Sequence, residues 1–167
     1  MRDSPGAIVR LASAALALTQ LAACGIFKSP AEELTFRAPQ EWRTFPAFNG
    51  TQVWSHSSQF LTLMRFPARV RDLDRLAGGS PNGQASWEVH TIVRRDMTLC
   101  ETQPSLYLET LRVSRLNGRR VHFYEVLSNS PDATYLAMYS RPEDTPSNQV
   151  AQAAIRELCP ASVQTAP

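Results

Sequence analysis

Three consecutive segments between residues 106 and 140 constrain the fold of this chain more than any other feature of its sequence. Residues 106–113, 119–127 and 134–140 are short runs rich in apolar, aromatic and β-branched side chains, separated by turn signals. Runs of this kind are typical of β-strands. Asn117-Gly118, between the first two segments, is a signal for a two-residue type I′ hairpin turn. We therefore expect three antiparallel strands in a meander.

Further strands are expected before this meander. Residues 34–39 alternate until Pro39 stops the pattern, and residues 51–56 form a short strand after the Asn49-Gly50 break. Residues 59–66 carry apolar side chains at both odd and even positions. A strand of that kind is covered on both faces, which predicts a central position in the sheet.

Helices are expected in three places. Residues 73–79 read as a helical turn ending on glycines, and residues 147–158 carry one apolar stripe, with Ser147 as the N-cap. Residues 85–99 are ambiguous. Their apolar side chains fall at helical spacing, which favours a helix, but the segment is rich in Val, Ile and Thr, and a strand is the alternative.

Length and composition exclude several classes of protein. The chain has 167 residues, a net charge of +2 and 43% hydrophobic residues, which is enough for one ordinary core. This composition is not that of a disordered chain, and no long apolar run recurs as in polytopic membrane proteins. The near-neutral charge also argues against a nucleic-acid-binding protein.

The order of elements predicts the α+β class: an antiparallel sheet with packed helices, in one domain of residues 34–160. Phe36, Pro39 and Trp42 near the first strand, the Asn117-Gly118 hairpin, Tyr135 and the closing helix together resemble the PsbP-like α/β/α sandwich. The resemblance covers about residues 34–159. It implies a binding or assembly role, because members of that fold mostly bind or assemble rather than catalyse.

The N-terminus has the three parts of a secretory signal. Arg2 and Arg10 precede a short stretch rich in Ala and Leu, which ends in Leu21-Ala22-Ala23-Cys24. This ending resembles the lipobox of bacterial lipoproteins. The resemblance implies cleavage after residue 23 and a diacylglyceryl group on the Cys24 sulfur. Residues 24–33 then form a lipidated tether and residues 161–167 a tail, and Gly25 in place of Asp favours the outer membrane where a cell has one.

Two cysteines remain after Cys24 is assigned to lipidation. An even pair in an exported chain indicates a disulfide between Cys100 and Cys159, with two free buried thiols as the alternative. Their separation is too large for a redox-active C-x-x-C pair. No catalytic role is expected for them.

The sequence indicates no catalytic or metal site. His56, His90 and His122 lie in different expected elements, without other ligands at metal-binding spacing. No G-x-S-x-G motif or glycine-rich phosphate loop is present. We therefore expect no cofactor and no enzyme activity, with an envelope hydrolase as the least favoured alternative.

A basic cluster flanks the expected hairpin turn and is the candidate partner-binding surface. It consists of Arg112, Arg115, Arg119 and Arg120. Such a tip could bind an anionic envelope component such as phospholipid, lipopolysaccharide or peptidoglycan, although solvated surface arginines are the simpler interpretation. The leading hypothesis is a non-enzymatic lipid-anchored envelope protein that binds an unknown envelope partner. The alternative is a small-ligand-binding lipoprotein with a cleft between sheet and helix, which Trp42, Trp54 and Trp87 could line if they are not core.

Overall fold

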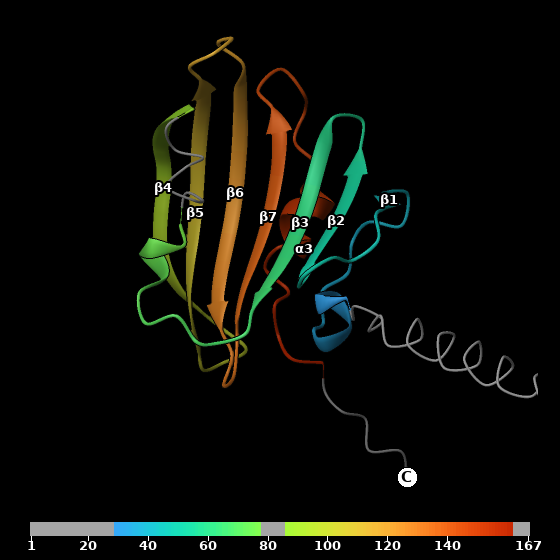
Figure 1. Cartoon of the computed structure of the whole chain (residues 1–167), viewed down its shortest axis with the longest axis vertical. Coiled ribbons are helices and arrows are strands. Elements are labelled where there is room, and N and C mark those ends of the chain that lie inside the picture. The colour runs from blue at the N-terminus through green and yellow to red at the C-terminus, as the bar shows by residue number, and fades with distance from the viewer. Residues whose placement is uncertain (1–28, 78–85, 162–167) are drawn as a thin grey trace, which may run out of the picture.

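The computed structural model describes residues 29–77 and 86–161, which form one seven-stranded antiparallel sheet. The strand order across it is β1-β2-β3-β7-β6-β5-β4 (Figure 1). The strands are β1 (Arg43–Thr44), β2 (Thr51–His56), β3 (Gln59–Phe66), β4 (Trp87–Leu99), β5 (Gln103–Ser114), β6 (Arg120–Asn129) and β7 (Thr134–Pro142). Neighbouring strands are antiparallel throughout. Within the described ranges, no helix has the length and apolar character needed to cross a bilayer.

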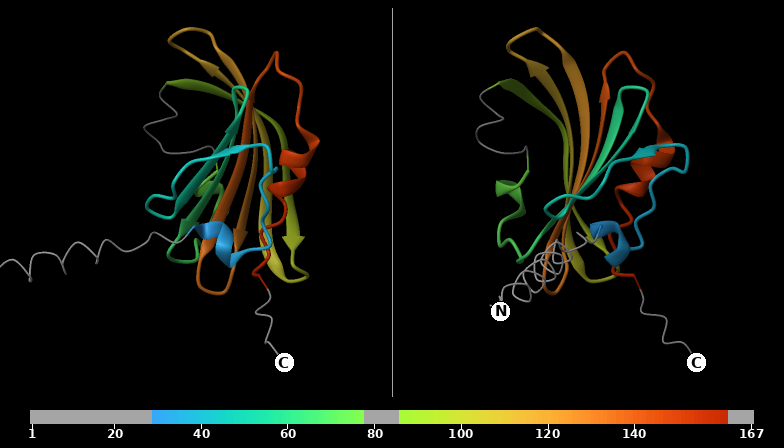
Figure 2. Two further views of the ribbon diagram at one scale, coloured as in Figure 1. Left: turned by 90° about the vertical axis from the view of Figure 1, so that its right-hand side faces the viewer. Right: turned by 45° about the vertical axis from the view of Figure 1, so that its right-hand side comes forward.

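The expected α+β class with packed helices is wrong, because the described residues are mainly β. They contain one α-helix, α3 (Gln149–Ala154), and two 3₁₀ helices, η2 (Pro30–Glu33) and η3 (Leu73–Arg75). The helix α3 lies against one face of the sheet and η3 against the other (Figure 2). Elements of three to six residues cannot form the helical layers of an α/β/α sandwich.

The predicted meander is present as β5, β6 and β7, but the turn between its first two strands differs from the prediction. Only Gly118 of the Asn117-Gly118 pair adopts the left-handed conformation (φ 68°), whereas a type I′ turn needs positive φ at both positions. The strands are joined instead by the loop of residues 115–119. A two-residue loop with positive φ at both positions occurs at Ser57 and Ser58, between β2 and β3.

Residues 85–99 were expected to favour a helix, and this prediction is wrong: β4 runs from Trp87 to Leu99. It is the edge strand beside β5, and residues 88–96 are all exposed. The register shifts between Thr91 and Val93, so Ile92 is an extra residue in a β-bulge. Side chains that are exposed on both faces of a strand do not have to alternate between apolar and polar. The bulge also interrupts the period of two along β4.

Residues 34–39 do not form the predicted strand. Leu34 and Phe36 are both 1% exposed and alternate with more exposed residues, as predicted, but the segment forms only one isolated bridge, from Leu34 to Pro160. Its alternation therefore reflects packing onto the sheet rather than membership of it. Residues 30–33 of the predicted tether also pack here, as η2.

The last helix is shorter than predicted and begins one residue later. Its N-cap is Asn148, whose side-chain oxygen accepts a hydrogen bond from the Ala151 N–H at 3.0 Å, while Ser147 bonds Gln152. Four residues of the predicted apolar stripe are buried, Ala151, Ala154, Ile155 and Leu158, but the fifth, Val150, is 62% exposed and does not pack on the sheet.

The core lies mainly between the sheet and the layer formed by η2, residues 34–42 and α3. Trp42, Trp54 and Tyr139 belong to this cluster. A smaller cluster on the opposite face, under η3, contains Leu106, Leu108, Leu127 and Leu136.

Cys100 and Cys159 form a disulfide, in agreement with the sequence prediction. Cys100 lies in the turn between β4 and β5, and Cys159 follows α3, with their Cα atoms 5.5 Å apart. The Cys159 carbonyl accepts a hydrogen bond from the Thr35 N–H at 2.7 Å. The bridge therefore ties both ends of the described domain to the edge of the sheet.

Candidate functional site

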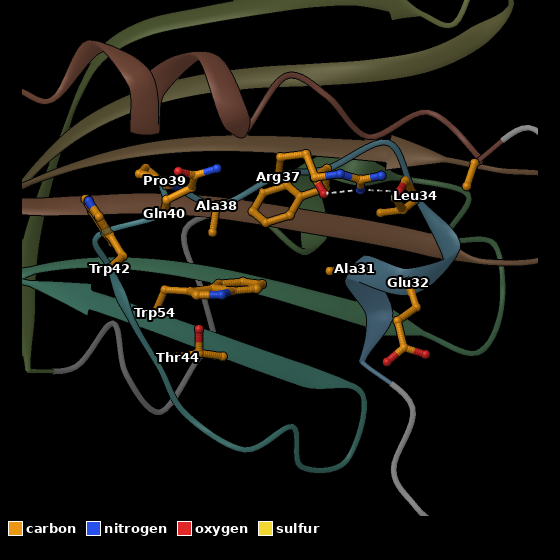
Figure 3. A pocket seen from close by; sticks show the side chains of 12 residues that line it. Ala31, Glu32, Leu34, Arg37, Ala38, Pro39, Gln40, Trp42, Thr44 and Trp54 are labelled. Atoms are coloured by element: carbon orange, nitrogen blue, oxygen red, sulfur yellow. Dashed lines mark hydrogen bonds between the residues drawn. The ribbon is translucent and has the colours of Figure 1, made fainter.

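A groove of about 530 Å³ lies beside the point where the described chain begins. It is bounded by η2, the extended residues 34–42, β1 and β2, and Trp54 lies flat across its middle (Figure 3). Glu32 and Trp42 stand at its two ends. The groove is thus formed at the edge of the sheet, not between the sheet and α3, where a ligand cleft was expected.

The aromatic side chains of the groove are chiefly core residues. Trp42 is 4% exposed and Trp54 is 7% exposed, and the Phe36 ring packs against Trp54 at 5.2 Å between centroids. Only their outer edges can form a floor for a ligand. Trp87, by contrast, is half-buried and lines a separate cleft of about 390 Å³ beside η3.

The one basic side chain among the groove residues is engaged in local contacts. The Arg37 guanidinium donates hydrogen bonds to the carbonyls of Leu34 and Phe36, at 3.2 and 2.8 Å. It therefore holds the extended segment in place and is not directed at a ligand. This arrangement brings no acid, base and nucleophile together.

A partly exposed contact fixes η2 to the sheet. The Tyr135 hydroxyl donates to the Glu33 carboxylate at 2.7 Å, and Arg65 pairs with the same carboxylate at 3.0 Å. Burial, together with the hydrogen bond to Glu33, raises the pKa of Tyr135 to about 12. The pKa of Arg65 is also raised, by its contact with Tyr135 and by Glu33. The segment η2, which follows Cys24 in the sequence, is therefore held against β3 and β7.

The four arginines of the predicted partner surface do not lie together. Arg112 forms an ion pair with Glu125 at 2.7 Å, with side chains that are 11% and 2% exposed, and its guanidinium lies 4.0 Å from the Phe123 ring centre. Arg120 forms an ion pair with Glu143 at the surface. Only Arg115 and Arg119 remain exposed without an ion pair to a described residue.

Sequence analysis missed the most exposed apolar side chain of this region. Leu116 lies between Arg115 and Asn117 and is 92% exposed. An apolar residue inside a turn, next to arginines, was the available signal.

The three histidines occupy separate places. His122 lies 4.0 Å from Glu143, and burial together with the nearby Arg141 lowers its pKa. His90 contacts Glu88 at 3.2 Å, and His56 stacks on Trp42. Across residues 29–77 and 86–161, no three His, Cys, Asp or Glu side chains are grouped so as to hold a metal ion. Cys24, the predicted lipidation site, lies outside the described residues, as do the signal segment and residues 162–167 of the predicted tail.

Comparison with known proteins shows a shared fold and no family. No protein-family model matches the chain, and no curated protein is significantly similar to it. A solved structure of a Pseudomonas aeruginosa protein of unknown function, PA94, a putative regulator, is 15% identical with a TM-score of 0.51. The overlap covers 77% of this chain and 98% of that one. At that identity the similarity shows the fold alone.

Two further solved structures overlap more weakly. LpqN of Mycobacterium tuberculosis, which is involved in cell envelope biogenesis, is 13% identical with a TM-score of 0.47, over 74% of this chain and 79% of that one. A Bacteroides thetaiotaomicron structure is 10% identical with a TM-score of 0.45, over 75% of this chain and 44% of that one. Neither overlap bears on the function of this chain.

Proposed function

We propose that this chain is a non-enzymatic lipoprotein of the cell envelope, anchored through acyl groups on Cys24, whose folded domain binds an envelope partner. The observation that carries the proposal is the run Leu21-Ala22-Ala23-Cys24 at the end of a signal-like N-terminus. One acyl chain binds a bilayer only marginally, whereas two or three hold it durably. With Gly25 after the cysteine, the outer membrane is favoured in a cell that has one.

Two features of the structure support this proposal. The Cys100–Cys159 disulfide is of the kind that persists in oxidising compartments outside the cytoplasm. In addition, Glu33, a few residues after Cys24, is fixed to the sheet through Tyr135 and Arg65. An anchor at Cys24 would therefore hold the whole domain, through a short linker, close to the membrane.

A binding role fits the site better than catalysis does. Arg37 in the groove is held by the backbone of its own segment, and Glu33 beside the groove is held by Tyr135. A catalytic group would need to be directed at a reacting atom. The exposed side chains of Arg115, Leu116 and Arg119, in the loop between β5 and β6, are instead suited to contact with a partner.

The anchor is tested by replacing Cys24 with Ala. The variant should be released from membranes into the soluble envelope fraction, and mass spectrometry of the wild-type protein should show acyl mass on residue 24. A double variant, Cys100→Ser with Cys159→Ser, is the matched control, because it removes the other two cysteines and should stay membrane-bound. Retention of the Cys24→Ala protein in membranes after a high-salt wash would exclude the proposal.

A second candidate function is the binding of a small apolar ligand in the groove. It is favoured by the groove volume of about 530 Å³, which lies in the usual range for ligand sites, and by Trp54 across its floor. Titration with a fatty acid should then change the tryptophan fluorescence saturably, and Ala38→Leu, which narrows the groove, should weaken that change. A linear response, unaffected by the substitution, would rule this candidate out.

A further inference from the structure

The loop of residues 115–119, here called the apex loop, presents one apolar side chain at the end of the molecule. It joins β5 and β6 at the top of Figure 1. Leu116 at its tip is 92% exposed, more than any other large apolar side chain of the described residues. Burial of such a side chain would be favourable, and the fold of this chain does not bury it.

Hydrogen bonds of the loop backbone fix Leu116 in its exposed position. Backbone N–H groups along the loop are bonded to partners within the hairpin or at the start of β4. These bonds are Arg115 N–H to the Ser86 carbonyl (3.0 Å), Leu116 N–H to Ser114 Oγ (3.3 Å), Gly118 N–H to the Ser114 carbonyl (2.9 Å) and Arg119 N–H to Asn117 Oδ1 (3.1 Å). Gly118 supplies the positive φ that the loop requires. The loop is therefore preorganised, and binding through it would cost little ordering entropy.

Two free positive charges flank this leucine. Arg115 and Arg119 are exposed and form no ion pair with a described residue, whereas Arg120, just behind them, is neutralised by Glu143. An apolar tip between guanidinium groups suits the boundary of an anionic bilayer, where the leucine reaches the acyl region and the arginines reach phosphates. A hydrated anionic polymer would be bound by the arginines alone and would leave Leu116 in water.

The apex loop lies at the opposite end of the sheet from the start of the described chain. Figures 1 and 2 place the β5–β6 turn at one end and η2 at the other in each view. The 12 residues of β5 span about 40 Å. The chain from Cys24 to Ser29 can reach at most about 18 Å. If the long axis of the domain stands upright on a bilayer that holds the Cys24 anchor, the apex loop therefore cannot reach that same bilayer.

From these observations we infer that the apex loop inserts Leu116 into an anionic bilayer that faces the one holding Cys24, with Arg115 and Arg119 on lipid phosphates. The protein would then bridge two membrane surfaces. This inference rests on the proposed lipid anchor and names the partner of the anchored domain: an anionic phospholipid surface.

A vesicle-capture assay with the lipidated full-length protein tests the inference. The protein is incorporated into donor vesicles of phosphatidylcholine and mixed with labelled acceptor vesicles that also contain phosphatidylglycerol. Capture of the acceptors should be seen, should weaken with salt, and should be absent with acceptors of phosphatidylcholine alone. Arg115→Gln with Arg119→Gln should weaken capture about 30-fold, and Leu116→Ser about 10-fold.

A matched control removes two charges elsewhere. Arg69 and Arg71 are exposed in the connection between β3 and η3, at the other end of the sheet, so Arg69→Gln with Arg71→Gln should leave capture unchanged. An equal loss in this control would mean that general charge, not the apex loop, is responsible, and would overturn the inference. Capture of neutral acceptors, or no capture at all, would overturn it as well.

Failure of the anchor can be told apart from failure of the apex loop. If the protein carries no acyl mass and does not enter donor vesicles, the proposed function fails. The Cys24→Ala protein is therefore also sedimented with the anionic vesicles, where the apex loop should still bind weakly. If that protein remains in the supernatant at low salt, the membrane role of the apex loop is refuted whatever the fate of Cys24.

Discussion

The ion pair between Arg112 and Glu125 should be a sensitive point for the stability of this fold. Glu125 is 2% exposed, and one of its carboxylate oxygens accepts from Arg112 at 2.7 Å. Replacing Arg112 with Met keeps an apolar stem but leaves the Glu125 carboxylate buried without a cation. Removing one member of a buried pair costs about 3–5 kcal/mol of unfolding free energy. Loss of the guanidinium from the Phe123 ring adds roughly 0.5–2 kcal/mol.

The double variant Arg112→Met with Glu125→Met separates the cost of an unpaired charge from the value of the pair. Replacing both members with apolar side chains of similar size is often neutral or stabilising. The double variant should therefore unfold close to the wild type, well above Arg112→Met alone. Urea unfolding, followed by tryptophan fluorescence and circular dichroism, gives the three free energies and the coupling between the sites.

A surface pair between the start of β6 and the residue after β7 is the control. The side chains of Arg120 and Glu143 are 50% and 41% exposed, so Arg120→Met should change the unfolding free energy little. If Arg112→Met loses no more stability than Arg120→Met, the Arg112 guanidinium is not held in a buried pair. In that case the prediction that Arg112 belongs to an exposed partner surface would regain support.

Three further predictions follow from individual contacts. Replacing both Cys100 and Cys159 with Ser should lower the unfolding free energy by about 4 kcal/mol or somewhat less, given the separation of 59 residues, and thermal unfolding with and without reductant checks this. The folded-state pKa of His122 is lowered by burial and by Arg141, so between pH 7 and 5.5 the unfolded chain binds more protons at this residue than the folded chain does. The free energy of unfolding should therefore fall as the pH falls, and it should fall less in His122→Gln. Urea unfolding midpoints across this pH range measure both. The pKa of Tyr135 is raised by burial to about 12, so its contribution to the free energy of unfolding is complete below pH 10 and is lost as the pH rises toward 12. Tyr135→Phe should therefore lose less stability than the wild type over this alkaline range. A stability profile for Tyr135→Phe identical to that of the wild type would contradict the contact with Glu33.

Apolar runs in the sequence predicted those strands that lie inside the sheet. Residues of β3, β6 and β7 face packed layers, so one set of side chains had to be apolar, as Leu61, Val126 and Ala137 show by being fully buried. The edge strand β4 has little to pack against, and its pattern carried almost no information. Its chance spacing of Val89, Ile92 and Val93 therefore indicated a helix that does not form.

The short helices were overestimated for a related reason. The apolar residues at 154, 155 and 158 are buried as predicted, but only residues 149–154 are α-helical. The bridge from Cys159 to Cys100 and the pairing of Pro160 with Leu34 fix the chain just beyond. These long-range contacts end the helix, and its apolar stripe gives no sign of them.

The predicted partner surface included too many arginines, because residues close together in the sequence were assumed to lie close together in space. The predicted type I′ turn would pair Arg112 with Phe123, whereas the longer loop pairs Arg112 with Val121. A slip of two residues keeps every side chain on its own face. Under either register, then, Arg112 shares a face with Glu125, while Arg120, next to Val121, lies on the opposite face. The alternation of faces along a strand thus already separated Arg112 from Arg120, whereas only the structure places Arg115 and Arg119 together in the loop.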